Sequence, residues 1–342
     1  MCGGPIRAIL LVMNENGHNT TSDGRTHDVV TVEHLGMRYG DLIAVDDVSF
    51  SVRRGEIFGI LGPNGAGKTT TVECIGGLRE PGSGQISVLG LHPGRDGDRL
   101  REIVGVQLQA SELPDKLKVG EALELFASFY SEPADVDSLL GLLGLSDKRD
   151  DRFAQLSGGQ RQRLSIALAL VGRPEVAILD ELTTGLDPRA RRDTWELIES
   201  VRDQGVTILL VTHFMEEAQR LCDRVALFNR GRLITVDSPA GLASRSGTDQ
   251  RVGFIPSEPL PDEWLLALPE VRDVSHHGER VETAGTGNLV GEVARMLIAH
   301  GIAPDDLRVE KTSLEDAFVA LTADDAAEDS SAAPELEHQE AG

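Results

Sequence analysis

The segment that most constrains the fold of this 342-residue chain is a glycine-rich stretch that follows a short apolar run. Residues 56 to 61 read Glu-Ile-Phe-Gly-Ile-Leu, the pattern of a buried strand. Residues 62 to 70 then read Gly-Pro-Asn-Gly-Ala-Gly-Lys-Thr-Thr, which fits G-x-x-x-x-G-K-[ST] in full, and a helix pattern continues over 68–76. Strand, glycine turn and helix in this order open a βαβ unit, so the sequence predicts an α/β fold.

The residue types in this stretch suit a phosphate-binding loop. Glycines let successive backbone N–H groups surround an anion, and the following helix presents its N-terminus to it. We expect Lys68 to reach the β- and γ-phosphates of a nucleotide and the Thr69 hydroxyl to ligate Mg²⁺. The alternative is a glycine-rich turn that matches by chance, but the strand before it and the helix after it argue against that. The predicted loop residues are Gly62, Pro63, Asn64, Gly65, Ala66, Gly67, Lys68, Thr69 and Thr70.

A pair of carboxylates follows a second apolar strand pattern. Residues 176 to 179 read Val-Ala-Ile-Leu and lead directly into Asp180 and Glu181. Ligand groups of parallel sheets collect at the carboxyl ends of strands, so both side chains are expected beside the phosphates. Asp180 would hold Mg²⁺, usually through water, and Glu181 would polarise the attacking water. Taken alone, an apolar strand followed by Asp-Glu is equally a solvated strand end.

A third motif, Leu156-Ser157-Gly158-Gly159-Gln160, lies between a helical stretch and Asp180. Ser157 is a good N-cap for the amphipathic helix pattern that follows, and the two glycines leave backbone donors open to an anion. The simpler interpretation is a helix cap without a ligand. The position of the motif, after an apparent all-helical insertion over 111–172, favours a functional role.

The glycine-rich loop, the Leu-Ser-Gly-Gly-Gln motif and the Asp-Glu pair, in this order along the chain, resemble the nucleotide-binding domain of ABC ATPases, and the similarity covers roughly residues 28–245. The resemblance implies a RecA-like P-loop ATPase core with a helical subdomain at about 111–172. It also implies that two such domains sandwich two ATP molecules, with Mg²⁺, each site pairing one phosphate loop with Ser157, Gly158, Gly159 and Gln160 of the other domain. One departure is Leu182, where the family usually has proline; we expect altered loop rigidity and retained chemistry.

The resemblance assigns roles to further residues. Tyr39 is similar to the aromatic residue that stacks on adenine, although it could equally pack on a strand. Gln109 resembles the glutamine that senses Mg²⁺ and the attacking water, and Gln107 competes for this role because it lies on the same strand face. Asp187, in Gly-Leu-Asp, resembles a residue of the loop that touches the partner subunit. His213, at the end of a strand pattern over 206–212, resembles the switch histidine that contacts the γ-phosphate.

The chain as a whole divides into four predicted parts. Residues 1–27 form a flexible leader, 28–248 the ATPase domain, and 249–322 a small α+β accessory domain. Residues 323–342 are acidic, contain no Lys or Arg, and are expected to be disordered. The longest early apolar run spans eight residues, or ~12 Å as a helix, which is too short for a hydrocarbon core of ~30 Å.

Charge and cysteine content exclude some classes of function. The formal net charge of -23 argues against non-specific binding to nucleic acid or anionic lipid. The cysteines Cys2, Cys74 and Cys222 show no metal-like spacing, so we expect reduced thiols in a cytosolic protein and no zinc.

Segments after His213 resemble the ATPase subunits of daunorubicin-type drug exporters; they lie at 214–225, 231–233, 239–242 and 313–322. This resemblance implies a separate membrane-spanning permease subunit and a cytoplasmic location on the inner face of the cell membrane. All the motifs are intact, so a homodimer of this chain would have two competent sites, and we expect a homodimer. The expected cargo is a drug or antibiotic-like compound, and the alternatives are a lipid, polysaccharide or peptide. From another class, a soluble non-transport ABC ATPase that acts on DNA or ribosomes is opposed by the charge. A purely structural phosphate-binding module would not need Glu181 and His213.

Overall fold

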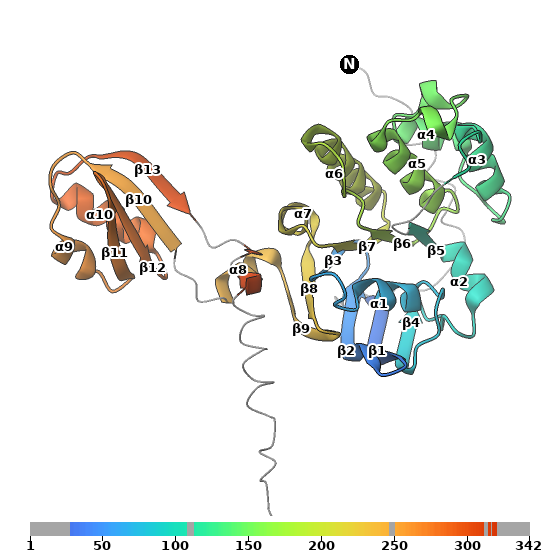
Figure 1. The fold of residues 1–342 in the computed structure, drawn as a ribbon, viewed down its shortest axis with the longest axis horizontal. Helices are drawn as coiled ribbons and strands as arrows, with labels where there is room; N and C mark the ends of the chain where they lie inside the picture. Colours follow the sequence, from blue (N-terminus) through green and yellow to red (C-terminus); the bar gives the residue numbers. More distant parts are fainter. Residues whose placement is uncertain (1–27, 108–112, 246–249, 311–313, 316, 320–342) are drawn as a thin grey trace, which may run out of the picture.

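The computed structural model describes residues 28–107, 113–245, 250–310, 314–315 and 317–319 of the chain (Figure 1). The strands are β1 (Asp28–Tyr39), β2 (Leu42–Arg53), β3 (Ile57–Leu61), β4 (Ser83–Val88), β5 (Val104–Gln107), β6 (Val176–Asp180), β7 (Thr207–Thr212), β8 (Arg224–Asn229), β9 (Arg232–Asp237), β10 (Gln250–Pro256), β11 (Val271–His277), β12 (Arg280–Gly285) and β13 (Pro304–Glu310). The helices are α1 (Lys68–Ile75), α2 (Gly97–Ile103), α3 (Val119–Ala127), α4 (Val136–Leu142), α5 (Gly158–Leu170), α6 (Pro188–Asp203), α7 (Met215–Leu221), α8 (Pro239–Arg245), α9 (Asp262–Leu266) and α10 (Leu289–Ala299), with short 3₁₀ turns η3 (Ser146–Lys148) and η4 (Phe153–Gln155).

The central sheet has the strand order β5-β6-β7-β3-β8-β9, and only its edge pair, β8 and β9, is antiparallel. Strands β3, β6 and β7 are apolar and fully buried, as expected for a parallel sheet covered on both faces. Alternate residues of β3 enter opposite cores: Ile57 faces the core built with α5 to α7, and Phe58 faces the core built with α1. The predicted α/β fold is therefore confirmed.

A second, antiparallel sheet of order β2-β1-β4 covers the α1 side of the central sheet. Apolar patterns at 29–32 and 44–52 predict strands where β1 and β2 lie, whereas no such pattern predicts β4. The two sheets meet through aromatic packing, because Phe50 of β2 stacks on Phe58 of β3 with ring centroids 5.3 Å apart. The same hairpin brings Val45 against the glycine-rich turn that follows β3.

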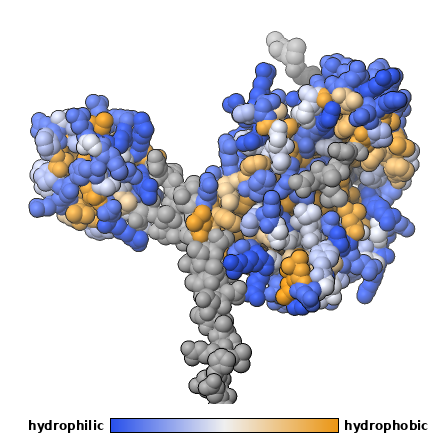
Figure 2. All heavy atoms as spheres, in the orientation of Figure 1, coloured by the Kyte–Doolittle hydropathy of each residue, from blue (hydrophilic) through white to orange (hydrophobic). Residues whose placement is uncertain are grey.

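Helices α3, α4 and α5 with η3 and η4 separate β5 from β6 and form the helical part of the molecule (Figure 1). Its interior joins the core beneath α5 and α6, through residues such as Leu123, Leu140 and Leu164. Its outer surface is partly apolar: Leu125 of α3 is 50% exposed and Phe129 is 68% exposed. Figure 2 shows apolar side chains gathered in this region.

The C-terminal module has a core of its own. Its elements follow the order β10-α9-β11-β12-α10-β13, and its antiparallel sheet has the order β11-β12-β10-β13. This is the ferredoxin-like arrangement, with α9 and α10 packed over apolar residues such as Val252 and Phe254. After β13 the chain rejoins the larger core, since Leu314 belongs to the same buried cluster as Leu242 of α8.

Candidate functional site

The candidate site lies at the carboxyl edge of the central sheet, where three strands end together. Leu61 pairs with Thr212 at the ends of β3 and β7, and Asp180 pairs with Val211 at the ends of β6 and β7. The glycine-rich loop, the Asp-Glu pair and His213 therefore leave the sheet side by side, as predicted for ligand groups of a parallel sheet.

The loop after β3 has a shape that requires glycine. Gly65 and Gly67 adopt positive φ angles of 80° and 93°, which L side chains rarely tolerate. A Cβ on Gly67 would stand 2.4 Å from the Ala44 carbonyl oxygen, and one on Gly62 would stand 2.4 Å from the Phe228 carbonyl oxygen. The loop thus fits closely between neighbouring strands, while Pro63 and Asn64 are exposed.

Lys68 and Thr69 begin α1 directly after the loop. The buried Lys68 ammonium donates hydrogen bonds to the carbonyl oxygens of Gly62 (2.8 Å) and Pro63 (2.9 Å), which holds it across the mouth of the loop. Burial lowers the pKa of Lys68, and the charges of Glu181 and Asp180 oppose that shift. A phosphate group in the loop would meet this ammonium and the N-terminal N–H groups of α1.

Asp180 and Thr69 offer hard oxygen ligands for a cation. The Thr69 hydroxyl lies 3.2 Å from Asp180 Oδ2, and Asp180 Oδ1 is buried without a hydrogen-bond partner. Burial raises the pKa of Asp180 to about 6, with the Thr69 hydrogen bond opposing this and the Glu181 charge adding to it. Mg²⁺ prefers oxygen ligands and commonly takes only one or two groups from the protein together with substrate phosphates. The pair therefore fits Mg²⁺. Among the described residues, no three His, Cys, Asp or Glu side chains gather as a metal site.

Glu181 and His213 meet beside this pair. His213 Nδ1 lies 3.0 Å from Glu181 Oε1, and the Glu181 side chain is only 10% exposed. Glu181 has a positive φ of 49°, an uncommon backbone state for a residue other than glycine, and its N–H donates to the Val211 carbonyl oxygen. Such strain persists only where the surroundings fix it, and it is commonly found at functional sites.

The two candidate glutamines differ in what the structure shows. Gln109 lies outside the described residues. Gln107 ends β5, is buried, and accepts a hydrogen bond from the Asp180 backbone N–H at 3.1 Å. Gln107 therefore supports the backbone of a candidate metal ligand.

The glycine motif before α5 and the loop before α6 lie side by side. Ser157 caps α5 in a reciprocal pair with Gln160: the hydroxyl accepts from the Gln160 N–H at 3.3 Å, and Gln160 Oε1 accepts from the Ser157 N–H at 2.9 Å. Asp187 caps α6 and accepts from two backbone N–H groups at 2.9 Å, which lowers its pKa. A Cβ on Gly158 would stand 3.9 Å from Leu186 Cδ2, and one on Gly159 would stand 3.2 Å from Ala190 Cβ, so the two segments are in contact.

Tyr39 lies at the tip of the β1–β2 hairpin and is 40% exposed. The Arg79 guanidinium stands 5.2 Å from the centre of its ring, a cation–π contact that sequence reasoning did not predict. Arg79 is in turn held by Glu73 of α1 at 2.7 Å. The remaining exposure of the tyrosine ring leaves room for stacking with another planar group.

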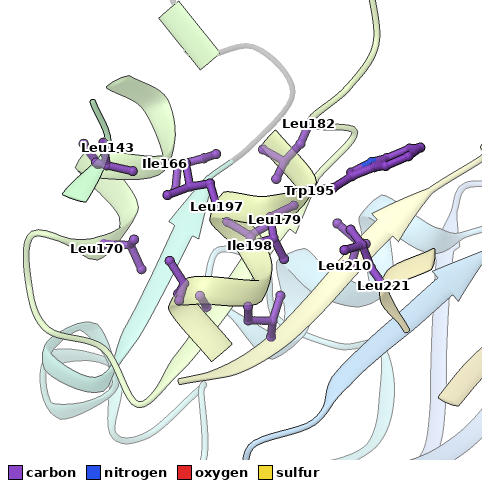
Figure 3. Packing of buried hydrophobic residues seen from close by; sticks show 14 of the residues in the cluster. Leu143, Ile166, Leu170, Leu179, Leu182, Trp195, Leu197, Ile198, Leu210 and Leu221 are labelled. Atoms are coloured by element: carbon purple, nitrogen blue, oxygen red, sulfur yellow. The ribbon is translucent and has the colours of Figure 1, made fainter. Parts of the chain in front are cut away.

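Leu182, the position where proline is usual, is fully buried. Figure 3 shows it in the apolar cluster with Trp195 of α6 and Leu179 of β6. Leucine therefore anchors the segment after Glu181 by burial of its side chain. Glu217, a fully buried carboxylate of α7 that accepts a hydrogen bond from the Trp195 indole, is not among the predicted residues. The sequence Met-Glu-Glu-Ala is typical of a surface helix, and its two glutamates do not indicate that one of them is buried.

Comparison with known proteins agrees with this geometry. A family model described as ABC transporter matches residues 45–184. The chain is 38% identical over 302 residues to a protein of Ralstonia nicotianae called Nod factor export ATP-binding protein I, which covers 86% of this chain and 94% of the relative. The chain belongs to the ABC transporter ATP-binding proteins. A protein of the same name from Burkholderia orbicola is 45% identical over 252 residues, covering 72% of this chain and 83% of that one.

Solved structures of this family share the fold. An ATP-binding subunit of an ABC transporter is 30% identical with a TM-score of 0.58, covering 64% of this chain and 93% of that one. The cbiO1 protein of Clostridium perfringens, described as part of the ABC transporter complex cbiONQ, is 30% identical with a TM-score of 0.57, covering 63% and 90%. The RecA-like P-loop fold is confirmed, and the chain is an ATPase that binds ATP with Mg²⁺ and serves transport.

No helix in the described part of the chain is long and apolar enough to span a membrane.

Proposed function

We propose that this ABC transporter ATP-binding protein is the ATPase subunit of an exporter, in which two copies close on ATP and drive transport through a separate permease subunit. The observation that carries the hydrolytic role is the contact of Glu181 with His213 beside Lys68, Thr69 and Asp180. A phosphate-binding module without hydrolysis would need neither member of that contact.

The geometry suggests a role for each group. Lys68 and the N–H groups of the loop would bind the β- and γ-phosphates, and Thr69 and Asp180 would hold Mg²⁺, which when bound neutralises phosphate charge. Glu181 is the group that would polarise the attacking water, since it is shielded from solvent and fixed by strained backbone. His213, fixed through Nδ1, would present its other ring nitrogen to the γ-phosphate. Gln109 and Gln107 remain the candidates for a sensor of water and metal.

The positions of the remaining motif residues support a homodimer. Ser157 and Asp187 cap neighbouring helices at a partly exposed surface, and the glycines between them leave backbone donors accessible. Such a surface can complete the phosphate site of a second copy. Every motif is present in this one chain, so two identical copies would form two complete sites, with Tyr39 stacking on each adenine.

The permease would dock on the helical part of the molecule. Leu125 and Phe129 are large apolar side chains that remain 50% and 68% exposed, and exposed apolar surface of this kind is typical of a docking site. Together with the absence of a spanning helix in the described residues, this supports a protein that is bound peripherally to the cytoplasmic face of the membrane through a partner.

For the cargo, we propose a drug or antibiotic-like compound on the sequence resemblance to daunorubicin-type exporters. The relatives named for Nod factor export support the direction of transport, and their name does not describe a drug, so a lipid, polysaccharide or peptide stays the alternative cargo. A non-transport ATPase acting on DNA or ribosomes is the second class of function, and the net charge of -23 opposes it.

The experiment is co-expression with each candidate permease gene in turn. The chain should pellet with membranes and gain ATPase activity only when that partner is present, and association should survive moderate salt because the docking surface is apolar. The variant Leu125→Ser/Phe129→Ser should lose stimulation and keep basal ATPase activity, whereas the control Leu42→Ser, 65% exposed on the β1–β2 hairpin, should keep both. A chain that stays unstimulated by every candidate permease and binds ribosomes or DNA would support the non-transport alternative.

A further inference from the structure

A buried carboxylate lies behind the Glu181–His213 contact and takes no part in the chemistry described so far. Glu217 of α7 has no exposed surface, and its Oε1 accepts a hydrogen bond from the Trp195 indole N–H of α6 at 3.1 Å. Burying a carboxylate is costly unless it is well partnered, and an apolar side chain of similar size would fill the same space. Packing alone therefore does not explain a glutamate at this position.

Two buried hydroxyls belong to the same cluster. Thr183, two residues after Glu181, and Thr212, the residue before His213, have no exposed surface, and both favour the charged form of Glu217. Burial has the larger effect and raises the pKa of Glu217. Glu217 Oε2 and Thr183 Oγ1 make no hydrogen bond of good geometry in this state. The carboxyl thus sits between the two chain segments that deliver Glu181 and His213.

A second contact runs from α6 to the same segment. The Arg191 guanidinium of α6 lies 5.1 Å from the centre of the Phe214 ring, and the Phe214 ring lies 4.1 Å from the ring of His213. Helix α6 begins at the Asp187 cap, in the loop proposed to face the second copy. A movement of that loop can therefore reach His213 through α6. The ion pairs Arg191–Glu216 and Arg220–Glu199 also join α6 to α7, but the hydrogen bond between Glu217 and Trp195 is the one formed by two buried side chains.

We propose that Glu217 is a positioning residue that holds His213 against Glu181 by tying α7 to Trp195 of α6. The inference rests on the proposed roles of His213 and Glu181. It predicts that loss of the carboxyl weakens recognition of the γ-phosphate while the rest of the nucleotide site stays intact.

The test compares the affinity of the full chain for Mg-AMP-PNP with its affinity for Mg-ADP. We define the ratio as the dissociation constant of Mg-ADP divided by that of Mg-AMP-PNP, so that it reports the contribution of the γ-phosphate alone. A general loss of structure would weaken the binding of both nucleotides and leave the ratio nearly unchanged. Glu217→Met, which keeps length without polar atoms, should lower the ratio by roughly fivefold or more. The control Glu196→Met removes an exposed carboxylate of α6, next to Trp195, and should leave the ratio unchanged. Glu217→Gln, which retains the acceptor for Trp195, should restore most of the ratio.

A double variant decides whether Glu217 acts through the histidine. If it does, His213→Ala and the double variant His213→Ala/Glu217→Met should show the same ratio, since the second change has nothing left to disturb. The inference would be overturned if the double variant lowered the ratio further than His213→Ala alone, or if Glu217→Met left the ratio unchanged. A full loss in His213→Ala with none in Glu217→Met would leave the proposed function standing, and an unchanged ratio in His213→Ala would remove both. Should Glu217→Met fail to fold, Trp195→Phe removes the indole donor, keeps an aromatic ring, and should lower the ratio in the same direction.

Discussion

Thr69 and Asp180 lie 111 residues apart in the chain, yet the Thr69 hydroxyl stands 3.2 Å from Asp180 Oδ2. The strand order β6-β7-β3 explains the contact, because the loop after β3 and the end of β6 face each other across the end of β7. A site for a cation is therefore arranged by the sheet itself. Its cost is a carboxylate that is buried beside a second one, Glu181.

That cost predicts how Asp180→Asn changes stability with pH. The pKa of Asp180 is raised from 3.8 to about 6 in the folded protein, so folding favours the protonated carboxyl. The contribution of this group to the free energy of unfolding is therefore fully present below pH 3.8 and is lost as the pH rises through about 6. Asparagine mimics the neutral form. In metal-free buffer at pH 8 the variant should be more stable than the parent by on the order of 2 kcal/mol, and the difference should shrink as pH falls through 6. Thermal melts with EDTA between pH 8 and 5 measure this, and a variant less stable at pH 8 would contradict it.

Glu181→Gln tests the catalytic carboxylate. The amide keeps a hydrogen-bond acceptor for His213 and cannot polarise water as a base, so ATP binding should persist while turnover falls by a factor of roughly 10² or more. ATP that is bound and not hydrolysed should hold two copies together, which size-exclusion chromatography with and without Mg-ATP can detect. Ordinary ATPase activity in this variant would remove Glu181 from the mechanism.

Tyr39→Ala tests the adenine contact. Loss of stacking should weaken ATP binding by roughly 1 to 3 kcal/mol, and it should not change the affinity for inorganic tripolyphosphate, which has no base. Leu42→Ala, in the same hairpin and 65% exposed, is the matched control. Equal weakening of ATP and tripolyphosphate would show that the change disturbs the phosphate loop instead.

Leu314→Ala tests the packing of the chain after β13. Leu314 is fully buried in the cluster that includes Leu242, so truncation should destabilise the ATPase domain by about 2 to 4 kcal/mol. Val319→Ala, at a position 62% exposed, should change the melting temperature by little. A similar small change for both would mean that the Leu314 segment contributes nothing to the domain.

Deletion of residues 323–342, which lie outside the described residues, is a separate prediction from composition. An acidic segment without Lys or Arg buries little surface, so the ATPase rate and the melting temperature should stay nearly unchanged. A melting temperature lower by several degrees would show that this segment docks on the protein.

The sequence predicts the structure best where an element is determined by residues that are neighbours in the chain. Buried strands β3, β6 and β7 were expected because continuous apolar runs mark parallel strands, and the cap at Ser157 was expected from the helix pattern that follows it. Strand β4 was missed because Ser83–Val88 includes Gly84 and Gln85 and shows little alternation.

The contacts that complete the site could not be predicted, since they depend on the order of strands and on helix packing. Nothing near Glu217 in the sequence indicates that α6 covers it, and nothing near Tyr39 indicates that Arg79 lies over its ring. The motif match predicted which residues gather at the carboxyl edge. The packing behind that edge required the three-dimensional structure.

The return of the chain to the ATPase core at Leu314 makes the ferredoxin-like module an insertion that is attached at both ends. A single protease cut between β10 and β13 would therefore leave two fragments that stay associated through the module's own sheet. Because the module has a separate core, it should also be removable by joining residue 245 to residue 314 through a short glycine-serine linker. Such an excision would keep the buried leucine that a simple C-terminal truncation discards.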